Sequence, residues 1–224
     1  ASLDRLSTGR RTINGTDPGG TAVASNITTQ ARSASIAARN AEDGISYLHA
    51  AEGVLMELAT LNTRLRELGV QKKSGLLSTI DKAAIESEEN EILSAANKIS
   101  EVKFNDRELL STFVLAINNA GTLSQMGVVV KPSFQSGISN ADTQSAIIQQ
   151  SLGQVAAGIN ALKGHQSNMY SLSANARAAA SRIQDTDFAK ESANLAQSSI
   201  LNQSALAMVA QANNAQAYIL TLLN

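Results

Sequence analysis

The chain of 224 residues contains no cysteine and no tryptophan, only two prolines, and few aromatic residues, which make up 3% of it. Without cysteine, it can form no disulfide bond and carry out no thiol chemistry. Large aromatic rings usually fill the irregular cores of compact enzymes, so their scarcity disfavours such a core. Pro18 and Pro132 fall where a helix would already be starting or ending, which leaves room for long helices between them.

The chain also has nearly balanced acidic and basic residues and no long apolar run. The formal net charge is −1, and lysine and arginine form no long run, so a surface for nucleic acid or anionic lipid has little support. No apolar run approaches the roughly 20 residues that a helix needs to cross a bilayer. We therefore expect neither a nucleic acid nor a membrane as a partner.

The residue types that carry catalysis or bind metals are sparse. His49 and His165 are the only histidines, and no acidic pattern lies nearby to orient either ring. No Gly-x-Ser-x-Gly elbow occurs. Four glutamates lie close together in sequence, but a solvated helix face explains them better than a metal site, because no histidine or further carboxylate cluster converges on them: Glu86, Glu88, Glu89 and Glu91. We expect no catalytic residues, no cofactor, no metal and no enzymatic activity.

What the chain does have is apolar residues at helical spacing. In its C-terminal third they recur at steps of four and three, which is typical of a helix packed along its length against a partner: Ile148, Leu152, Val155, Ile159 and Leu162. A second stripe, alanine-rich at first and leucine-rich later, runs through the N-terminal half: Ile27, Ala31, Ala34, Ala38, Ala41, Ile45, Leu48, Leu55, Leu58, Leu61, Leu65 and Leu68. The alanines predict a closer partner at the start of this stripe. Together the stripes predict an all-α, elongated fold, an antiparallel coiled-coil helical rod.

We expect three regions along the chain. Residues 1–20 should hold the end of a helix and a connecting loop. Residues 21–183 should form a rod domain with helices over about 21–70, 78–102 and 141–183, and residues 184–224 a C-terminal helix. Ile80 and Ile85 should point inward on the second rod helix. Alternation at Phe113, Leu115 and Ile117, turn residues at 118–121 and β-branched residues at 128–130 predict a small β-hairpin within 109–130.

Several stretches resemble one known family. They are LSTGRRTIN (6–14), ARNAEDGISYLHAAEGVLMEL (38–58) and TRLRELGVQ (63–71) near the N-terminus, and SRIQDTDFAKESANLAQSSILNQSALAMVAQAN (181–213) and YILTLLN (218–224) at the C-terminus. The first three resemble the N-terminal region of bacterial flagellins, and the last two their C-terminal region. One departure concerns Phe104-Asn105-Asp106, where family members often have Phe-Asn-Gly.

The resemblance implies a structural subunit of the bacterial flagellar filament, which polymerises by coiled-coil packing for motility. Residues 110–140 suffice only for a hairpin and a link, so we expect a compact form without large outer domains, with most of the N-terminal core helix missing. The family's route is export by the flagellar type III apparatus to the outside of the cell. The partners it implies are other copies, a flagellin-specific secretion chaperone, filament cap and hook-associated proteins, and a vertebrate Toll-like receptor.

The resemblance also nominates two surfaces. Arg64, Leu65, Glu67 and Leu68 match a stretch used for subunit packing and, in many flagellins, for receptor recognition; Glu88 or Glu89 would join it. The plain alternative is a buried stripe with a solvated edge. The second surface is the C-terminal helix, which would expose apolar residues in a free monomer and lie in a chaperone groove: Leu195, Leu206, Val209, Leu220 and Leu223. Its plain alternative is a helix docked on its own chain.

Two other functions are open at this point. A hook-associated junction protein shares the terminal architecture, but the close match over 181–213 favours the filament subunit. A coiled-coil signalling module, such as a chemoreceptor stalk, should turn tightly at a helical tip, whereas a β-like stretch and Pro132 lie between the helices here. An enzyme is a distant third.

Overall fold

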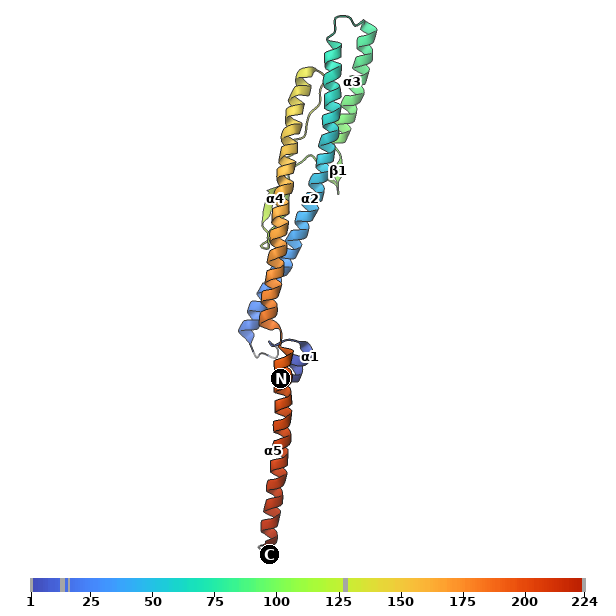
Figure 1. Ribbon diagram of the computed structural model, residues 1–224. Coiled ribbons are helices and arrows are strands. Elements are labelled where there is room, and N and C mark those ends of the chain that lie inside the picture. The colour runs from blue at the N-terminus through green and yellow to red at the C-terminus, as the bar shows by residue number, and fades with distance from the viewer. Residues whose placement is uncertain (1, 13–14, 16, 127–128, 223–224) are drawn as a thin grey trace. The chain divides into compact units, whose positions relative to one another are not determined.

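The structure is a computed structural model that describes residues 2–12, 15, 17–126 and 129–222 (Figure 1). The chain divides into two compact units: unit 1 comprises residues 1–29 and 175–224, and unit 2 comprises residues 30–174. The elements are α1 (Ser2–Thr8), α2 (Pro18–Lys72), α3 (Thr79–Ser100), β1 (Lys103–Phe104), β2 (Arg107–Glu108), β3 (Phe113–Ala116), β4 (Leu123–Met126), α4 (Ile138–Gln184) and α5 (Phe188–Leu222). The predicted helical class with a small hairpin is confirmed.

Helix ends follow local sequence signals. Pro18 opens α2 at a position where its missing N–H costs nothing, and Asp17 accepts from the backbone N–H of Gly20 at 2.7 Å. At α3, the Ser78 side chain accepts from the N–H of Asp81 while the Asp81 carboxylate accepts from the N–H of Ser78, a capping box. Helix α1 ends at Thr8, and the next residue, Gly9, has a φ of 67°, which suits a C-terminal cap.

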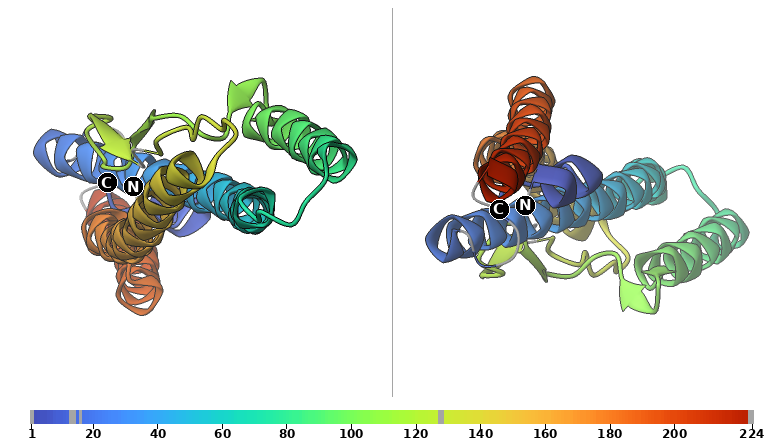
Figure 2. Two further views of the ribbon diagram at one scale, coloured as in Figure 1. Left: turned by 90° about the horizontal axis from the view of Figure 1, so that it is seen from above. Right: turned by 90° about the horizontal axis from the view of Figure 1, so that it is seen from below.

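Unit 2 is built around α2, which lies between α3 and α4 (Figures 1 and 2). Both predicted stripes meet in its core: Leu48, Leu55 and Leu58 of α2 are fully covered, as are Val155 and Leu162 of α4. One prediction was wrong. Ile80 is 80% exposed rather than inward, because it lies in the first turn of α3, before that helix reaches the core.

The alanine-rich part of α2 comes close to α4, as predicted. Ala31, Ala34 and Ala38 are fully buried, and the Ser173 hydroxyl of α4 donates to the carbonyl oxygen of Ala31 at 2.9 Å. Such a bond from a short side chain to a neighbouring helix backbone requires a small interaxial distance. Gly44 permits a similar approach of the β3–β4 hairpin, because a Cβ atom there would lie 2.4 Å from Cδ1 of Leu115.

The β3–β4 hairpin pairs antiparallel, with Phe113 opposite Met126 and Ala116 opposite Leu123. Its first strand matches the predicted alternation, since Phe113 and Ile117 are buried. The second strand does not match. Residue 128 lies outside the described residues, and Val129 and Val130 are not in a strand. The turn at 118–121 is short, with Gly121 at φ 72°, so the partner strand begins immediately after it.

A second, unpredicted pair of strands replaces the expected break at Phe104-Asn105-Asp106. Strands β1 and β2 pair antiparallel across Asn105 and Asp106, whose φ angles are 51° and 60°. Two successive positive φ angles are the signature of a type I′ hairpin turn. Aspartate therefore adopts here the left-handed conformation that glycine would adopt at lower cost.

In unit 1, α1 packs beside the first turns of α5. Arg5 forms an ion pair with Glu191 at 3.6 Å, and Glu191 is buried. Just beyond α1, the Arg11 N–H donates to the carbonyl of Gln184 and the Thr186 N–H donates to the carbonyl of Gly9. These bonds fix the segment between α4 and α5 against the chain that follows α1.

Candidate functional site

Within the described residues, no group of three or more histidine, cysteine, aspartate or glutamate side chains is placed to hold a metal ion. His49 lies on the surface of α2, with Nδ1 3.2 Å from a carboxylate oxygen of Glu52 one turn along. No helix in this described part has a segment both long and apolar enough to cross a membrane.

The Arg64–Leu68 segment of α2 divides into a buried and an exposed part. Leu65 and Leu68 belong to the apolar interior of unit 2, at 3% and 1% exposure. Arg64 and Glu67 are exposed. Nε of Arg64 donates to Glu88 of α3 at 2.7 Å, and its NH1 donates to Glu67 at 3.1 Å. Hydrogen bonds to Glu88 and then Glu67 raise the pKa of Arg64. A partner at this surface would therefore meet Arg64, Glu67 and Glu88, and not the leucines.

A second ion-pair group joins α2 to α3 nearer the turn. Nζ of Lys72 lies 2.9 Å from Glu86 and 3.1 Å from Glu89, and hydrogen bonds to Glu86 and then Glu89 raise the pKa of Lys72. Glu89 is only 3% exposed. The solvated-face interpretation of the glutamates is thus wrong for Glu89, which Lys72 pairs in the interface between the two helices. Sequence spacing gave no sign of this, because the pairing depends on where α3 folds back.

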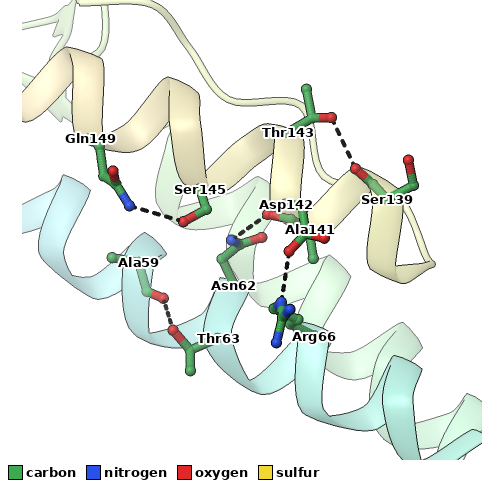
Figure 3. Close-up of polar contacts among 10 residues, drawn as sticks. All are labelled: Ala59, Asn62, Thr63, Arg66, Ser139, Ala141, Asp142, Thr143, Ser145 and Gln149. Atoms are coloured by element: carbon green, nitrogen blue, oxygen red, sulfur yellow. Dashed lines mark hydrogen bonds and ion pairs between the residues drawn. The ribbon is translucent and has the colours of Figure 1, made fainter.

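A polar contact interrupts the apolar packing of α2 on α4 (Figure 3). Nδ2 of Asn62, a residue 4% exposed, donates to the carbonyl oxygen of Ala141 at 2.8 Å. Next to it, Nε of Arg66 donates to Asp142 at 2.6 Å. These bonds tie the first turn of α4 to one level of α2, so they set the register of the two helices. Sequence reasoning missed Asn62; its place between Leu61 and Leu65, at the edge of a stripe, was the available signal.

Helix α5 carries the largest set of uncovered apolar side chains. Every residue from 196 to 216 is exposed, and six large apolar residues of α5 are more than half exposed: Phe188, Ile200, Leu201, Leu206, Met208 and Val209. Leu195 is half-buried. The side chain of Leu220 and the whole of Leu223 lie outside what the structure describes. Exposed apolar residues in this number make α5 a candidate interaction surface.

Comparison with known proteins shows the family of the chain. A model of the bacterial flagellin N-terminal helical region matches residues 1–114, and a model of the C-terminal helical region matches residues 136–223. A flagellin of Halalkalibacterium halodurans is 31% identical over 99% of this chain and 90% of its own length. The flagellar filament core protein flaB2 of Brachyspira hyodysenteriae is 31% identical over 93% of this chain and 86% of its own length. The crystal structure of a Bacillus cereus flagellin aligns with 62% of this chain and 88% of its own, at 14% identity and a TM-score of 0.43.

The two matched regions lie in the expected order and leave only the hairpin segment and its flanks between them. They confirm the family predicted from the terminal motifs, and the relatives named as flagellar filament proteins agree with the predicted role. The chain belongs to the bacterial flagellin family and is a structural subunit of the flagellar filament.

Proposed function

We propose that α5 is the surface through which this subunit is held, first by a secretion chaperone and then by other copies of the chain in the filament. The observation that carries the proposal is the uninterrupted exposure of residues 196–216, which include Leu206, Met208 and Val209. Burying such side chains contributes about 1.5–3 kcal/mol each. A helix with this much uncovered apolar surface gains stability only from a partner that covers it.

The decisive experiment compares one substitution at two exposed methionines. Met208 of α5 is 74% exposed and Met56 of α2 is 60% exposed. Met208→Glu should prevent filament formation, because it places a charge in the surface that assembly buries. Met56→Glu should leave filaments intact in electron micrographs. Equal assembly of the two variants would refute the role of α5.

The same side chains would contact the chaperone before export. A groove on a carrier protein can accept the apolar face of a helix. We expect Leu206→Ala combined with Val209→Ala to weaken binding of the full chain to a purified flagellin chaperone, measured by calorimetry. Leu3→Ala, at another exposed leucine of unit 1, is the matched control. A chaperone that binds both variants equally well would place its site elsewhere.

The remaining partners follow from this route. The subunit would leave the cell through the flagellar type III export apparatus and add to the filament outside, between hook-associated proteins at the base and the cap at the tip. Support for this part comes from the match of both terminal regions to the family. Detection of the chain in shed filaments, and its retention in cells that lack the export apparatus, would test it.

A vertebrate Toll-like receptor is a second candidate partner, and the exposure of Arg64 and Glu67 favours it. The neighbouring Arg66 offers a matched control, since it is equally exposed and pairs with Asp142 instead. If the receptor recognises this edge of α2, Arg64→Ala should lower signalling in a receptor reporter assay, and Arg66→Ala should not. Unchanged signalling for both variants would remove the receptor from this surface.

A further inference from the structure

Unit 2 contains an apolar pocket of about 280 Å³ that the filament role does not yet explain. We call it the aromatic pocket; its walls include Tyr47, Phe104, Phe113 and Leu115, and Gly44 lines it without a side chain. The rings support one another, since Tyr47 lies 4.7 Å from Phe113 and 6.1 Å from Phe104 between ring centroids. The pocket is therefore held open by packed aromatic groups and presents an apolar interior.

Two charges stand at the rim of the aromatic pocket. Asp43 comes from α2 and Arg107 from β2, and both are exposed. Neither forms an ion pair with any residue that the structure describes. A charged group that enters the pocket can therefore form an ion pair with Asp43 or Arg107.

The turn between α2 and α3 presents the opposite shape. We call residues 73–80 the tip. Leu76 is 97% exposed, the highest value among the large apolar side chains described, and Ile80 is 80% exposed. Backbone bonds from Lys73 to Val70 and from Ser74 to Gln71 hold the start of the tip, and the Ser78 capping box holds its end. The tip is thus an ordered apolar projection, and its first residue, Lys73, has no ion-pair partner among the described residues.

The tip cannot fill the pocket of its own chain. Helix α3 has 22 residues, which span about 33 Å, and it separates the tip from β1 and β2. Figure 1 shows the tip and β1 at opposite ends of α3. An open helical polymer requires two different complementary patches on each subunit, because each copy contacts the next one in the same sense. A projection and a pocket on one unit meet this requirement.

We propose that the tip of one subunit inserts Leu76 into the aromatic pocket of a second copy of the chain. Lys73 of the tip then lies near Asp43 at the rim, and Leu76 contacts the rings of Tyr47 and Phe104. The inference rests on the filament function and adds a specific contact to it, separate from α5. It explains why an apolar side chain is held almost fully in solvent next to charged residues.

The absence of cysteine from the chain allows a direct test by cross-linking. Gly75→Cys combined with Arg107→Cys keeps Leu76, Lys73 and Asp43, and it places one thiol beside Leu76 and one on the wall of the pocket. In the full chain under assembly conditions, this double variant should give a ladder of dimers, trimers and longer products with a short bismaleimide. Either single variant should give no product, and mixing the two single variants should give dimers only. Gly75→Cys with Met56→Cys is the matched control, because Met56 is exposed on α2 but does not line the pocket.

The possible cross-linking results either support or contradict the contact between tip and pocket. Filaments without a ladder would overturn the inference and leave the filament function standing. Dimers from Gly75→Cys alone would show a contact between two tips and would also overturn it. A ladder in a solution without filaments would support the tip–pocket contact independently of α5. As a second measurement, Asp43→Lys should raise the critical concentration for assembly about tenfold, and Lys73→Asp should restore it in the double variant. No rescue would exclude the charge pair.

Discussion

Unit 2 and helix α5 use the same kinds of residue, but only unit 2 covers its apolar side chains with its own chain. Leu55 of α2 is fully buried, whereas Leu206 of α5 is 71% exposed. Helix propensity is similar in the two places, because leucine and alanine favour helix in both. What differs is the presence of a partner. Apolar content along a helix therefore predicts that the helix will be packed, and the fold decides whether the partner is in the same molecule.

Leucine-to-alanine substitution in the two regions should give the largest difference in the free energy of unfolding. Leu55→Ala should lower the free energy of unfolding of the monomer by about 2–5 kcal/mol, because it leaves a cavity in a packed interior. Leu206→Ala should change the same quantity by less than about 0.5 kcal/mol, because water already surrounds that side chain. Urea unfolding followed by circular dichroism measures both values.

In filament formation, Leu206→Ala should have the larger effect of these two variants. Leu206→Ala should weaken filament formation, measured by sedimentation, at a protein concentration where the unchanged chain assembles. A large loss of monomer stability from Leu206→Ala would contradict the comparison, because it would mean that unit 1 already covers this side chain.

Two glycines on α2 should respond differently to alanine substitution, with smaller changes in the free energy of unfolding. A Cβ atom at Gly44 would lie 2.4 Å from Leu115 and 3.0 Å from Leu162, whereas one at Gly53 would meet nothing within 4 Å. Gly44→Ala should therefore destabilise unit 2 by about 1–3 kcal/mol through overpacking. Gly53→Ala should stabilise it by up to about 1 kcal/mol, because alanine favours helix. Thermal unfolding of the two variants tests the pair; stabilisation by both would mean that the hairpin does not rest on Gly44.

The β1–β2 turn offers an effect of about 1 kcal/mol. Asn105 and Asp106 both have positive φ. Glycine adopts this conformation without strain, whereas a residue with a Cβ atom adopts it at a cost in free energy. Asp106→Gly should stabilise unit 2 by about 1 kcal/mol, since the left-handed conformation costs a residue with a Cβ about 1–2 kcal/mol. Asp106→Ala, which keeps the Cβ, is the control and should not stabilise. Equal unfolding temperatures for the glycine variant and the unchanged chain would argue against a type I′ turn.

Sequence reasoning was most successful where a pattern is long. The stripes of α2 and α4 extend over many turns, so polar residues further along α4, such as Gln166 and Ser173, do not hide them. The structure adds roles for both, since Gln166 donates to Glu42 and Ser173 to the backbone of α2. The start of α2 at Pro18 was also predictable, because that signal depends only on neighbouring residues.

Short or long-range features could not be predicted in this way. Strands β1 and β2 have two residues each, too few to show alternation. The position of β4 depends on the geometry of the preceding turn, and the burial of Glu89 depends on how α3 folds back onto α2. The tip–pocket pair is also invisible in the sequence, because the pocket gathers residues from α2, β1, β2 and β3. Exposure at Leu76 becomes meaningful only once that pocket is known.

The pH dependence of stability at the start of α3, the helix of unit 2 that carries the capping box, should be the smallest of these changes. Hydrogen bonds from the Ser78 side chain and backbone lower the pKa of Asp81 below its usual value of 3.8. A carboxylate with a lowered pKa in the folded chain contributes stability above the unfolded pKa, and this contribution is lost as pH falls through the folded pKa. The unchanged chain should therefore lose stability below about pH 4 relative to Asp81→Asn, which has no proton to gain. Ser78→Ala removes the hydroxyl and leaves the backbone N–H, so it should reduce this difference without abolishing it. Urea unfolding between neutral pH and about pH 2 tests this in the unchanged chain, Asp81→Asn, Ser78→Ala and the double variant Ser78→Ala/Asp81→Asn. If aspartate and asparagine at position 81 differ as much with alanine at position 78 as with serine, the Ser78 hydroxyl does not cause the lowered pKa.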